Sequence, residues 1–303
     1  MRSITTILLV CICSTGNAQY FEVGLFGGAS NYQGDLAPFA FTPKETHLAY
    51  GYFTKFNFNK YASLKISGYY GEISGDDKNS KNEWRLRRNL SFRSEIWELS
   101  TFAEINLTGF DPHSRKKLLS PYAFIGFGVF HFNPQAFYEG QWYDLQPLGT
   151  EGQGTSAYPD RDKYKLMSFS FPMGLGFKGS ITEHWNVALE MGWRKTFTDY
   201  LDDVSSTYIA KEILIAENGE LSWELSNRMD ETIYGEGFEP DDSKYRGDPD
   251  DLDWYIFSGI TVSYNFDLLR WDLQKNTYKE DGNGKTNGLK SSRKKMGCPK
   301  NLR

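Results

Sequence analysis

Cysteine is scarce in this sequence, and its positions exclude most structural roles for it. Three of the 303 residues are cysteines, and two of these lie in the apolar run 4–13 near the start of the chain. Arg2 precedes this run and the small residues 16–18 follow it, a pattern typical of a cleaved signal peptide over residues 1–18. Cys298 then stands alone in an exported chain, which excludes an internal disulfide and a cysteine-based zinc site.

Long apolar runs, histidine clusters and catalytic motifs are also missing. After residue 13 no apolar run approaches the length of a membrane-spanning helix. None of the four histidines stands at metal-ligand spacing from a carboxylate or a cysteine, and the sequence has no Gly-x-Ser-x-Gly, P-loop or dinucleotide fingerprint. We therefore expect a protein that is not an enzyme. One alternative stays open: His131, between two phenylalanines, could serve a lipid-modifying enzyme together with a serine.

Aromatic residues and glycine are abundant instead, with 19 Tyr, 22 Phe, 8 Trp and 29 Gly. They recur in segments with the two-residue alternation of β-strands. Trp97, Leu99 and Ile105, for example, share one face of a segment whose other face carries Glu98 and Glu104. Eight such segments are predicted to be strands: 20–28, 47–58, 61–73, 93–107, 121–133, 164–179, 184–197 and 253–267.

Alternation alone does not separate a soluble sandwich from a membrane barrel, but two further features favour the barrel. The segments run to about 9–16 residues, whereas ordinary strands have about 5–6. Their polar faces also carry charges that a soluble core would not tolerate, four acidic and four basic. Because an eight-stranded barrel is only wide enough to be filled by side chains, we expect paired charges in the lumen and no water channel. These charges are Glu22, Lys55, Lys65, Glu98, Glu104 and Glu190, with Lys178 and Arg194 expected at strand ends in water.

The connections between the segments are alternately short and long, which predicts the orientation. Outer-membrane barrels place short turns in the periplasm and long loops outside the cell. The fold prediction is therefore an eight-stranded antiparallel transmembrane β-barrel over residues 19–267 in the cell outer membrane, in contact with its lipid. Long extracellular loops and a basic periplasmic tail over 268–303 complete this prediction.

The last long loop, about 198–252, and the tail have opposite charges. Over 199–253 there are 17 Asp or Glu and 4 Lys or Arg, a net charge of −13; over 268–303 there are 10 basic and 3 acidic residues, a net charge of +7. The tail composition predicts flexibility, and because it is the main basic region, nucleic-acid binding is disfavoured. Calcium is the one cofactor that the acidic loop suggests, although the spacing differs from an EF-hand. Its candidate ligands are Asp241, Asp242, Asp248, Asp250, Asp251 and Asp253.

Three stretches resemble a known family. They are GGASNYQGDL over 27–36, RNLSFR over 88–93 and FTDYLDDVS over 197–205. Together they resemble the PorG-like outer-membrane proteins of the Bacteroidetes type IX secretion system. The resemblance implies a small barrel that does no chemistry, contacts the periplasmic ring proteins of the secretion machine and helps to anchor that ring to the outer membrane.

The first stretch also has a physical interpretation, as a strand that runs into a turn at the barrel rim. Asn31 and Asp35 are expected to form side-chain turns, Gly34 to take a positive φ, and Tyr32 to close the barrel mouth. The third stretch adds Asp199, Tyr200, Asp202 and Asp203 to the same predicted rim.

Two basic segments are candidate docking sites for the ring proteins. One is in the tail, at Arg293, Lys294 and Lys295, and the other is in a short periplasmic turn, at Arg115, Lys116 and Lys117. Two other functions stay open: a surface adhesin or receptor that uses the acidic loop, and a small passive channel.

Overall fold

The computed structural model describes residues 20–37, 42–114, 116–232 and 240–266. The predicted signal peptide over 1–18 and the tail over 268–303 lie outside the described residues. The same is true of four of the six candidate docking residues, namely Arg115, Arg293, Lys294 and Lys295.

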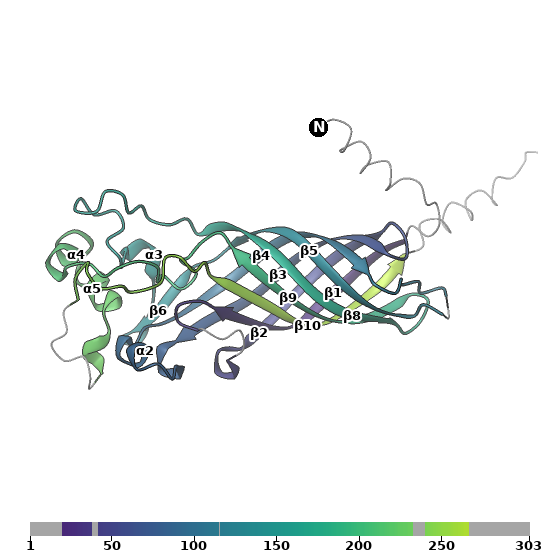
Figure 1. Ribbon diagram of the computed structural model, residues 1–303, viewed down its shortest axis with the longest axis horizontal. Helices are drawn as coiled ribbons and strands as arrows, with labels where there is room; N and C mark the ends of the chain where they lie inside the picture. The colour runs from purple at the N-terminus through teal and green to yellow at the C-terminus, as the bar shows by residue number, and fades with distance from the viewer. Residues whose placement is uncertain (1–19, 38–41, 115, 233–239, 267–303) are drawn as a thin grey trace, which may run out of the picture.

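Eight long strands form a closed antiparallel barrel, as predicted (Figure 1). The sheet order is β3-β2-β1-β10-β9-β8-β5-β4, and a further pairing of β3 with β4 closes it. The first and last strands are antiparallel neighbours, so β1 begins and β10 ends at the same end of the barrel. The strands are β1 (Tyr20–Gln33), β2 (His47–Asn57), β3 (Ala62–Asp76), β4 (Ser91–Asn106), β5 (Leu119–His131), β8 (Met167–Ser180), β9 (Trp185–Thr196) and β10 (Trp254–Phe266).

All eight predicted segments are strands, but the end of β1 was predicted wrongly. The strand continues to Gln33 instead of ending at Gly28, so the stretch around Tyr32 is strand and not turn. The reason is the partner strand, because Ser30 to Gln33 pair in register with Phe257 to Trp254 of β10. The wall on this side of the barrel therefore rises above the expected rim.

A second departure is a β-hairpin in a segment that was predicted to be loop. Strands β6 (Pro134–Tyr138) and β7 (Gln141–Asp144) are joined by Glu139 and Gly140, both at positive φ, and are followed by α3 (Leu145–Leu148). Such a two-residue turn matches the twist of its strands. β6 pairs with β4 through Arg93 and Gln135, so the hairpin extends the sheet beyond the barrel.

Short helices gather at the long-loop end of the barrel (Figure 1). Two of them, α4 (Lys211–Asn218) and α5 (Glu220–Ser226), belong to the last long loop. None of the helices in the described ranges is both long enough and apolar enough to cross a membrane. The elements are η1 (Pro43–Glu45), η2 (Asp77–Asn79), α2 (Glu83–Arg88), α4 (Lys211–Asn218), α5 (Glu220–Ser226) and η3 (Met229–Glu231).

The outer surface of the barrel is apolar. Aromatic side chains flank it, with Tyr70 against Trp97 toward the long loops and Trp185 against Tyr264 toward the short turns. A closed sheet has no open edge and satisfies its backbone groups between neighbouring strands, so such a surface can face lipid. The protein is an outer-membrane barrel. The exposed apolar side chains of its wall include Val23, Leu25, Tyr52, Phe56, Ile66, Leu99, Ile105, Ile125, Phe127, Phe169, Leu175, Phe177, Leu189, Ile260 and Val262.

Candidate functional site

The interior of the barrel is filled by a charge network. Eight charged side chains point inward and none is more than 6% exposed. Four are acidic and four are basic, so their charges balance as the sequence predicted. We call this set the lumen network: Glu22, Glu98, Glu104, Glu190, Lys55, Lys65, Lys178 and Arg194.

The lower part of the lumen network, toward the short turns, centres on Glu104. Its carboxylate accepts a hydrogen bond from the ammonium of Lys178 and lies 3.1 Å from that of Lys55. Lys55 also lies 3.8 Å from Glu22, whose carboxylate accepts a hydrogen bond from Asn57 at 2.9 Å. Each charge here therefore has an opposite charge beside it, which offsets the large cost of removing it from water.

Aromatic hydroxyls complete the middle of the network. Lys65 donates to both carboxylate oxygens of Glu190, at 2.9 and 2.7 Å. The same two oxygens accept hydrogen bonds from Tyr69 at 3.0 Å and from Tyr122 at 2.9 Å. Glu190 is thus held by one cation and two phenols, and the rings fill the space between the strands.

Near the long-loop end Arg194 is 3.2 Å from Glu98, which also accepts a hydrogen bond from Tyr255 at 2.6 Å. The expectation that Lys178 and Arg194 lie in water is wrong, because they are 2% and 1% exposed. Lys178 lies over the ring of Phe110, a fully buried residue of a short turn. The turn closes one end of the barrel, and the folded long loops close the other.

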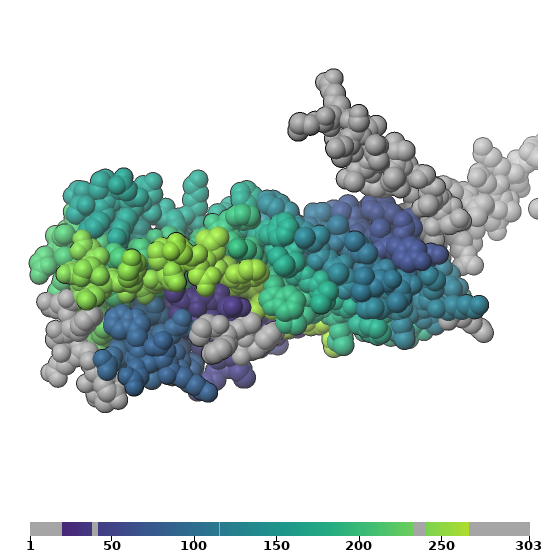
Figure 2. All heavy atoms as spheres, viewed as in Figure 1, coloured from purple at the N-terminus to yellow at the C-terminus, as the bar shows by residue number. Residues whose placement is uncertain are grey.

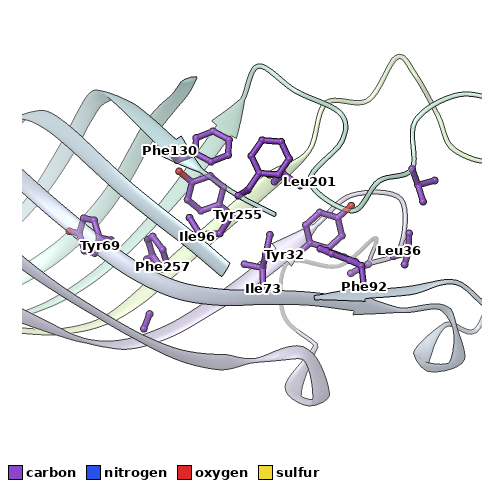
Figure 3. Packing of buried hydrophobic residues seen from close by; sticks show 14 of the residues in the cluster. Tyr32, Leu36, Tyr69, Ile73, Phe92, Ile96, Phe130, Leu201, Tyr255 and Phe257 are labelled. Carbon is purple, nitrogen blue, oxygen red and sulfur yellow. The ribbon is translucent and has the colours of Figure 1, made fainter. Parts of the chain in front are cut away.

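The long loops form a folded layer that we call the cap: residues 34–37, 42–46, 77–90, 132–166, 197–232 and 240–253. Figure 2 shows segments of very different colour, and so of distant sequence position, packed together at this end. Buried apolar side chains join the cap to the inner wall of the barrel, including Leu36, Leu201 and Phe92 around Tyr32 (Figure 3). The mouth is therefore covered by packed protein.

Arg88 joins three segments of the cap. Its guanidinium donates to both carboxylate oxygens of Asp77 at 2.8 Å. It also donates to the backbone carbonyl of Asp35 at 3.0 Å and to that of Arg246 at 2.6 Å. Because the group is buried, these bonds are more than surface contacts, and loss of the arginine would leave Asp77 as an unpaired buried charge.

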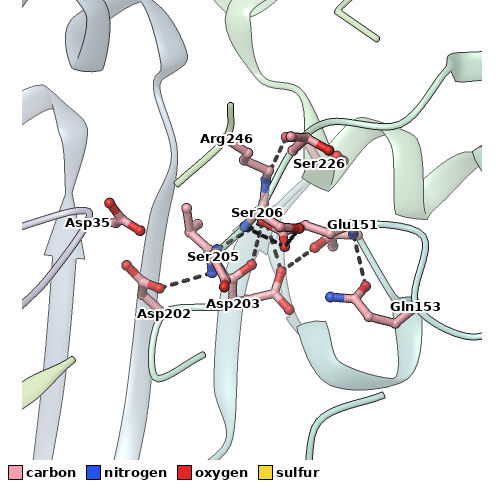
Figure 4. Close-up of polar contacts among 12 residues, drawn as sticks. Asp35, Glu151, Gln153, Asp202, Asp203, Ser205, Ser206, Ser226 and Arg246 are labelled. Carbon is pink, nitrogen blue, oxygen red and sulfur yellow. Dashed lines mark hydrogen bonds and ion pairs between the residues drawn. The ribbon is translucent and has the colours of Figure 1, made fainter. Parts of the chain in front are cut away.

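Arg246, whose carbonyl accepts a hydrogen bond from Arg88, joins further segments of the cap (Figure 4). It lies 3.1 Å from Glu151 and 3.5 Å from Asp203, and it donates to the Ser226 carbonyl at 3.2 Å. Glu151 in turn accepts hydrogen bonds from the backbone amides of Ser205 and Ser206, both at 3.0 Å. Two long loops are thereby tied together.

Tyr32 reaches from β1 into the cap, as predicted for a residue that closes the mouth. Its hydroxyl oxygen is 2.6 Å from Asp202 and 2.8 Å from Asp253. Burial, followed by the negative charge of Asp35, raises the pKa of Asp202 to about 8. Burial and the charge of Asp202 raise the pKa of Asp253 well above its ordinary value.

Gly34 was expected to take a positive φ, and this is wrong, since it is not among the positive-φ glycines. Glycine is needed there for a different reason. A Cβ atom at this position would collide with the Tyr32 hydroxyl and the Asp253 carboxylate. Asp35 accepts a hydrogen bond from the amide of Asp248 at 3.1 Å, and Asn31 donates to the Thr46 hydroxyl at 2.7 Å. Both therefore bind other segments instead of forming turns within their own.

The predicted rim residues of the third stretch are also in the cap. The ring of Tyr200 stacks on that of Tyr164 at 4.7 Å, and the Tyr164 hydroxyl donates to Asp203 at 2.7 Å. Asp199 is 7% exposed, and neither of its carboxylate oxygens has a partner at hydrogen-bond geometry. Burial is the main cause that raises the pKa of Asp199 to about 8, although the nearby Ser205 hydroxyl lowers it in part.

The aspartates proposed as calcium ligands do not converge. Asp253 binds Tyr32, whereas Asp242 accepts a hydrogen bond from Tyr158 at 3.0 Å. In the parts of the chain that the structure describes, no three His, Cys, Asp or Glu side chains form a group that could hold a metal ion. His131 faces outward on β5 and lines an apolar groove of about 620 Å³ on the barrel wall, beside Trp97 and Met167.

Sequence reasoning missed Arg88, Arg246 and Glu151, which hold the cap together. Arg88 stands at the start of the second family-like stretch, so the signal was present but was given no role. Arg246 is one of four basic residues in the acidic loop, and this scarcity could have marked it. Glu151 had no local signal, because the partners of its carboxylate lie 54 or more residues further along the chain.

Comparison with known sequences adds a family. The sequence model of a domain of unknown function, DUF6089, matches residues 1–212 of the 303. The chain belongs to the DUF6089 family. The DUF6089 match ends within α4, so the last barrel strand, β10, lies beyond it. No curated protein matches the sequence.

Solved outer-membrane proteins are similar to this DUF6089 chain at low identity. Ail of Yersinia pestis is 7% identical with a TM-score of 0.38, over 82% of this chain and 100% of Ail. Neisserial surface protein A is 7% identical with a TM-score of 0.38, over 81% of this chain and 97% of its own. OprG of Pseudomonas aeruginosa is 9% identical with a TM-score of 0.33, over 82% and 98%. These likenesses are too remote for any inference about function.

Proposed function

We propose that the protein is a non-enzymatic outer-membrane component of a type IX-like protein secretion machine, which contacts and anchors the periplasmic ring. The observation that carries the proposal is that the three PorG-like stretches, far apart in sequence, meet in the cap. Tyr32 of the first binds Asp202 of the third, and Arg88 of the second binds the carbonyl of Asp35 in the first. The resemblance thus falls on one built site.

The filled lumen supports a role without transport through the barrel. A passive channel needs a continuous water path, whereas here the paired charges and rings of the lumen network occupy the interior and the cap covers the mouth. We therefore propose that the protein acts through its surfaces, of which the periplasmic surface is the one that a ring could reach.

The turn at the short-loop end offers one such surface. Lys116 is exposed there, while the ammonium of Lys117 donates to the Thr108 carbonyl at 3.3 Å and is partly committed to its own turn. The tail with its net charge of +7 is the other candidate. Both are basic, so we propose an acidic surface on the ring protein as the contact.

A detergent pull-down with mass spectrometry tests this proposal. The full chain, a version that ends after Asp267 and a Lys116→Ser/Lys117→Ser variant are compared. A Lys163→Ser/Lys165→Ser variant is the matched control, because it removes two positive charges from the opposite end. Ring proteins lost only on truncation assign the contact to the tail, and ring proteins lost only with the turn variant assign it to the turn. Recovery of no ring protein with the full chain would refute the proposal.

The cap is the observation that favours a second candidate, a surface receptor or adhesin. Exposed aromatic side chains project from it at Phe137 and Trp142, and Arg93 stacks over Trp142 at 3.6 Å. Replacement of Trp142 and Phe137 by serine would abolish attachment to cells or matrix while secretion continues, if this role holds. Loss of secretion with attachment intact after deletion of the whole gene would exclude it.

A further inference from the structure

Two buried carboxyl groups in the cap share a single phenol hydroxyl. The Tyr32 oxygen lies within hydrogen-bond distance of both Asp202 and Asp253. A tyrosine hydroxyl carries one proton, so it can donate to one carboxylate only. The second short contact between oxygens is attractive only if that carboxyl carries a proton and donates it to the tyrosine. The geometry therefore requires one proton on the carboxyl pair.

The surroundings of the pair also favour a proton. Asp202 is faced by Asp35, and Asp253 by Asp199, so further acids surround the pair. The backbone amides of Val204 and Leu201 donate to the two carboxyl groups, each at 2.9 Å. These neutral donors cannot balance two negative charges.

The positive charges near the pair do not contact its carboxyl groups. Arg88 attracts Asp202 from a distance, but its guanidinium binds both oxygens of Asp77. Arg85, from the same helix, acts on Asp35. Arg246 is bound to Glu151 and lies 3.5 Å from Asp203. Among the described residues no ammonium or guanidinium group contacts either carboxyl of the pair.

The positions of the two aspartates link the proton to the conformation of the acidic loop. Asp202 follows β9 and Asp253 precedes β10, so they mark the two ends of the acidic loop. We propose that Tyr32, Asp202 and Asp253 form a proton-dependent latch that holds both ends of this loop in the barrel mouth. With one proton on the pair the latch is closed. Without it, two adjacent carboxylates compete for one hydroxyl and the loop is released.

The direction of the pH effect follows from the sign of the shift. The folded cap raises the pKa of Asp202 to about 8, above the ordinary value for a carboxyl group. An acid whose pKa is higher in the folded form than in the unfolded chain stabilises the folded form at low pH. This stabilisation is lost as the pH rises through the folded-state pKa. The latch is therefore closed at neutral and acidic pH and opens in alkali.

Limited proteolysis of the full-length protein in detergent tests the latch. Trypsin can cut at Lys211 and Lys244, and the products are followed by mass from about pH 6 to about pH 10, a range that brackets the proposed proton loss. Asp253→Asn replaces one acid by a neutral amide of the same shape. Asp250→Asn removes an exposed charge from the same loop and is the matched control. Dividing each rate by that of Asp253→Asn cancels the pH profile of the protease.

We expect the relative cleavage rate of the wild type and of Asp250→Asn to rise as the pH approaches about 8, by up to about tenfold per pH unit for loss of one proton, and to level off above it. A ratio that stays constant over the whole range would overturn the proposal. If Asp253→Asn does not fold, infrared spectroscopy of the wild type replaces it. The carbonyl-stretch band of a protonated carboxyl should be present at neutral pH and vanish in alkali, and its absence at neutral pH would also overturn the latch.

Discussion

Glu104 is the position where the lumen network can be tested most directly. It is 1% exposed and is the acid that binds Lys178, whereas Lys55 has a second acid, Glu22, at 3.8 Å. Glu104→Gln keeps the shape of the side chain and removes its charge. The lumen network then holds three acids and four bases, and Lys178 is left as a buried cation without a partner.

The expected cost is large. Removal of one partner from a buried ion pair typically destabilises a protein by about 3–5 kcal/mol. Since about 1.4 kcal/mol is tenfold in an equilibrium constant, the unfolding equilibrium should shift by more than two powers of ten. The double variant Glu104→Gln/Lys178→Met restores the balance at three acids and three bases. Its free energy of unfolding should recover to within about 2 kcal/mol of the wild type, because a buried pair is often replaced by apolar groups at little cost.

Equilibrium unfolding in urea, with the barrel in lipid vesicles and tryptophan fluorescence as the signal, measures these differences. Asp160→Asn, an exposed acid of the cap, is the control and should lie within about 0.5 kcal/mol of the wild type. The reasoning is refuted if Glu104→Gln lowers the free energy of unfolding by less than about 1 kcal/mol, since an unpaired buried charge should destabilise the protein by more than that. It is refuted equally if the double variant is no more stable than the single one.

Three further predictions concern the cap and the barrel wall. Gly34→Ala forces a Cβ against the latch, so tryptic cleavage of the acidic loop should accelerate while the urea midpoint of the barrel is unchanged. Arg246→Met leaves Glu151 a buried, unpaired charge, and hydrogen exchange over 203–206 should increase, whereas no increase would show that the ion pair is dispensable. Leu189→Arg on the lipid-facing wall should cost about 2–4 kcal/mol in vesicles, with Leu189→Phe near neutral, and equal effects of the two would contradict the membrane placement.

The barrel could be predicted from the sequence because its signal is local. Strand parity repeats every two residues, so each segment separates lipid-facing from lumen-facing positions without reference to its neighbours. Where the wall depends on a distant partner, the prediction failed. β1 continues through Tyr32 because residues of β10, more than 200 positions away, extend the ladder. The same distance explains the wrong reason given for Gly34, whose crowding comes from Asp253.

The cap could be predicted only in part. The motif residues were placed at the rim correctly, but nothing in their spacing showed that Tyr32 meets Asp202 across 170 positions. Arg88 binds the carbonyl of Arg246 across 158 positions, a contact that leaves no periodic trace in either segment. The hairpin β6–β7 had a turn signal at Glu139-Gly140, which was overlooked because the flanking strands have only five and four residues.

The pairing of β1 with β10 makes the chain ends of the barrel into a seam. Phe21 pairs with Phe266 at the short-turn end of this seam, and Gln33 pairs with Trp254 at the long-loop end. The barrel therefore cannot close until its last strand is in place. Tyr32 and Asp253 lie at the upper end of the seam, where they act as a clasp across it. The contact that holds the acidic loop can therefore form only after β1 and β10 have paired. A chain cut before Asp253 would lack both the last strand of the barrel and the partner of Tyr32 across the seam.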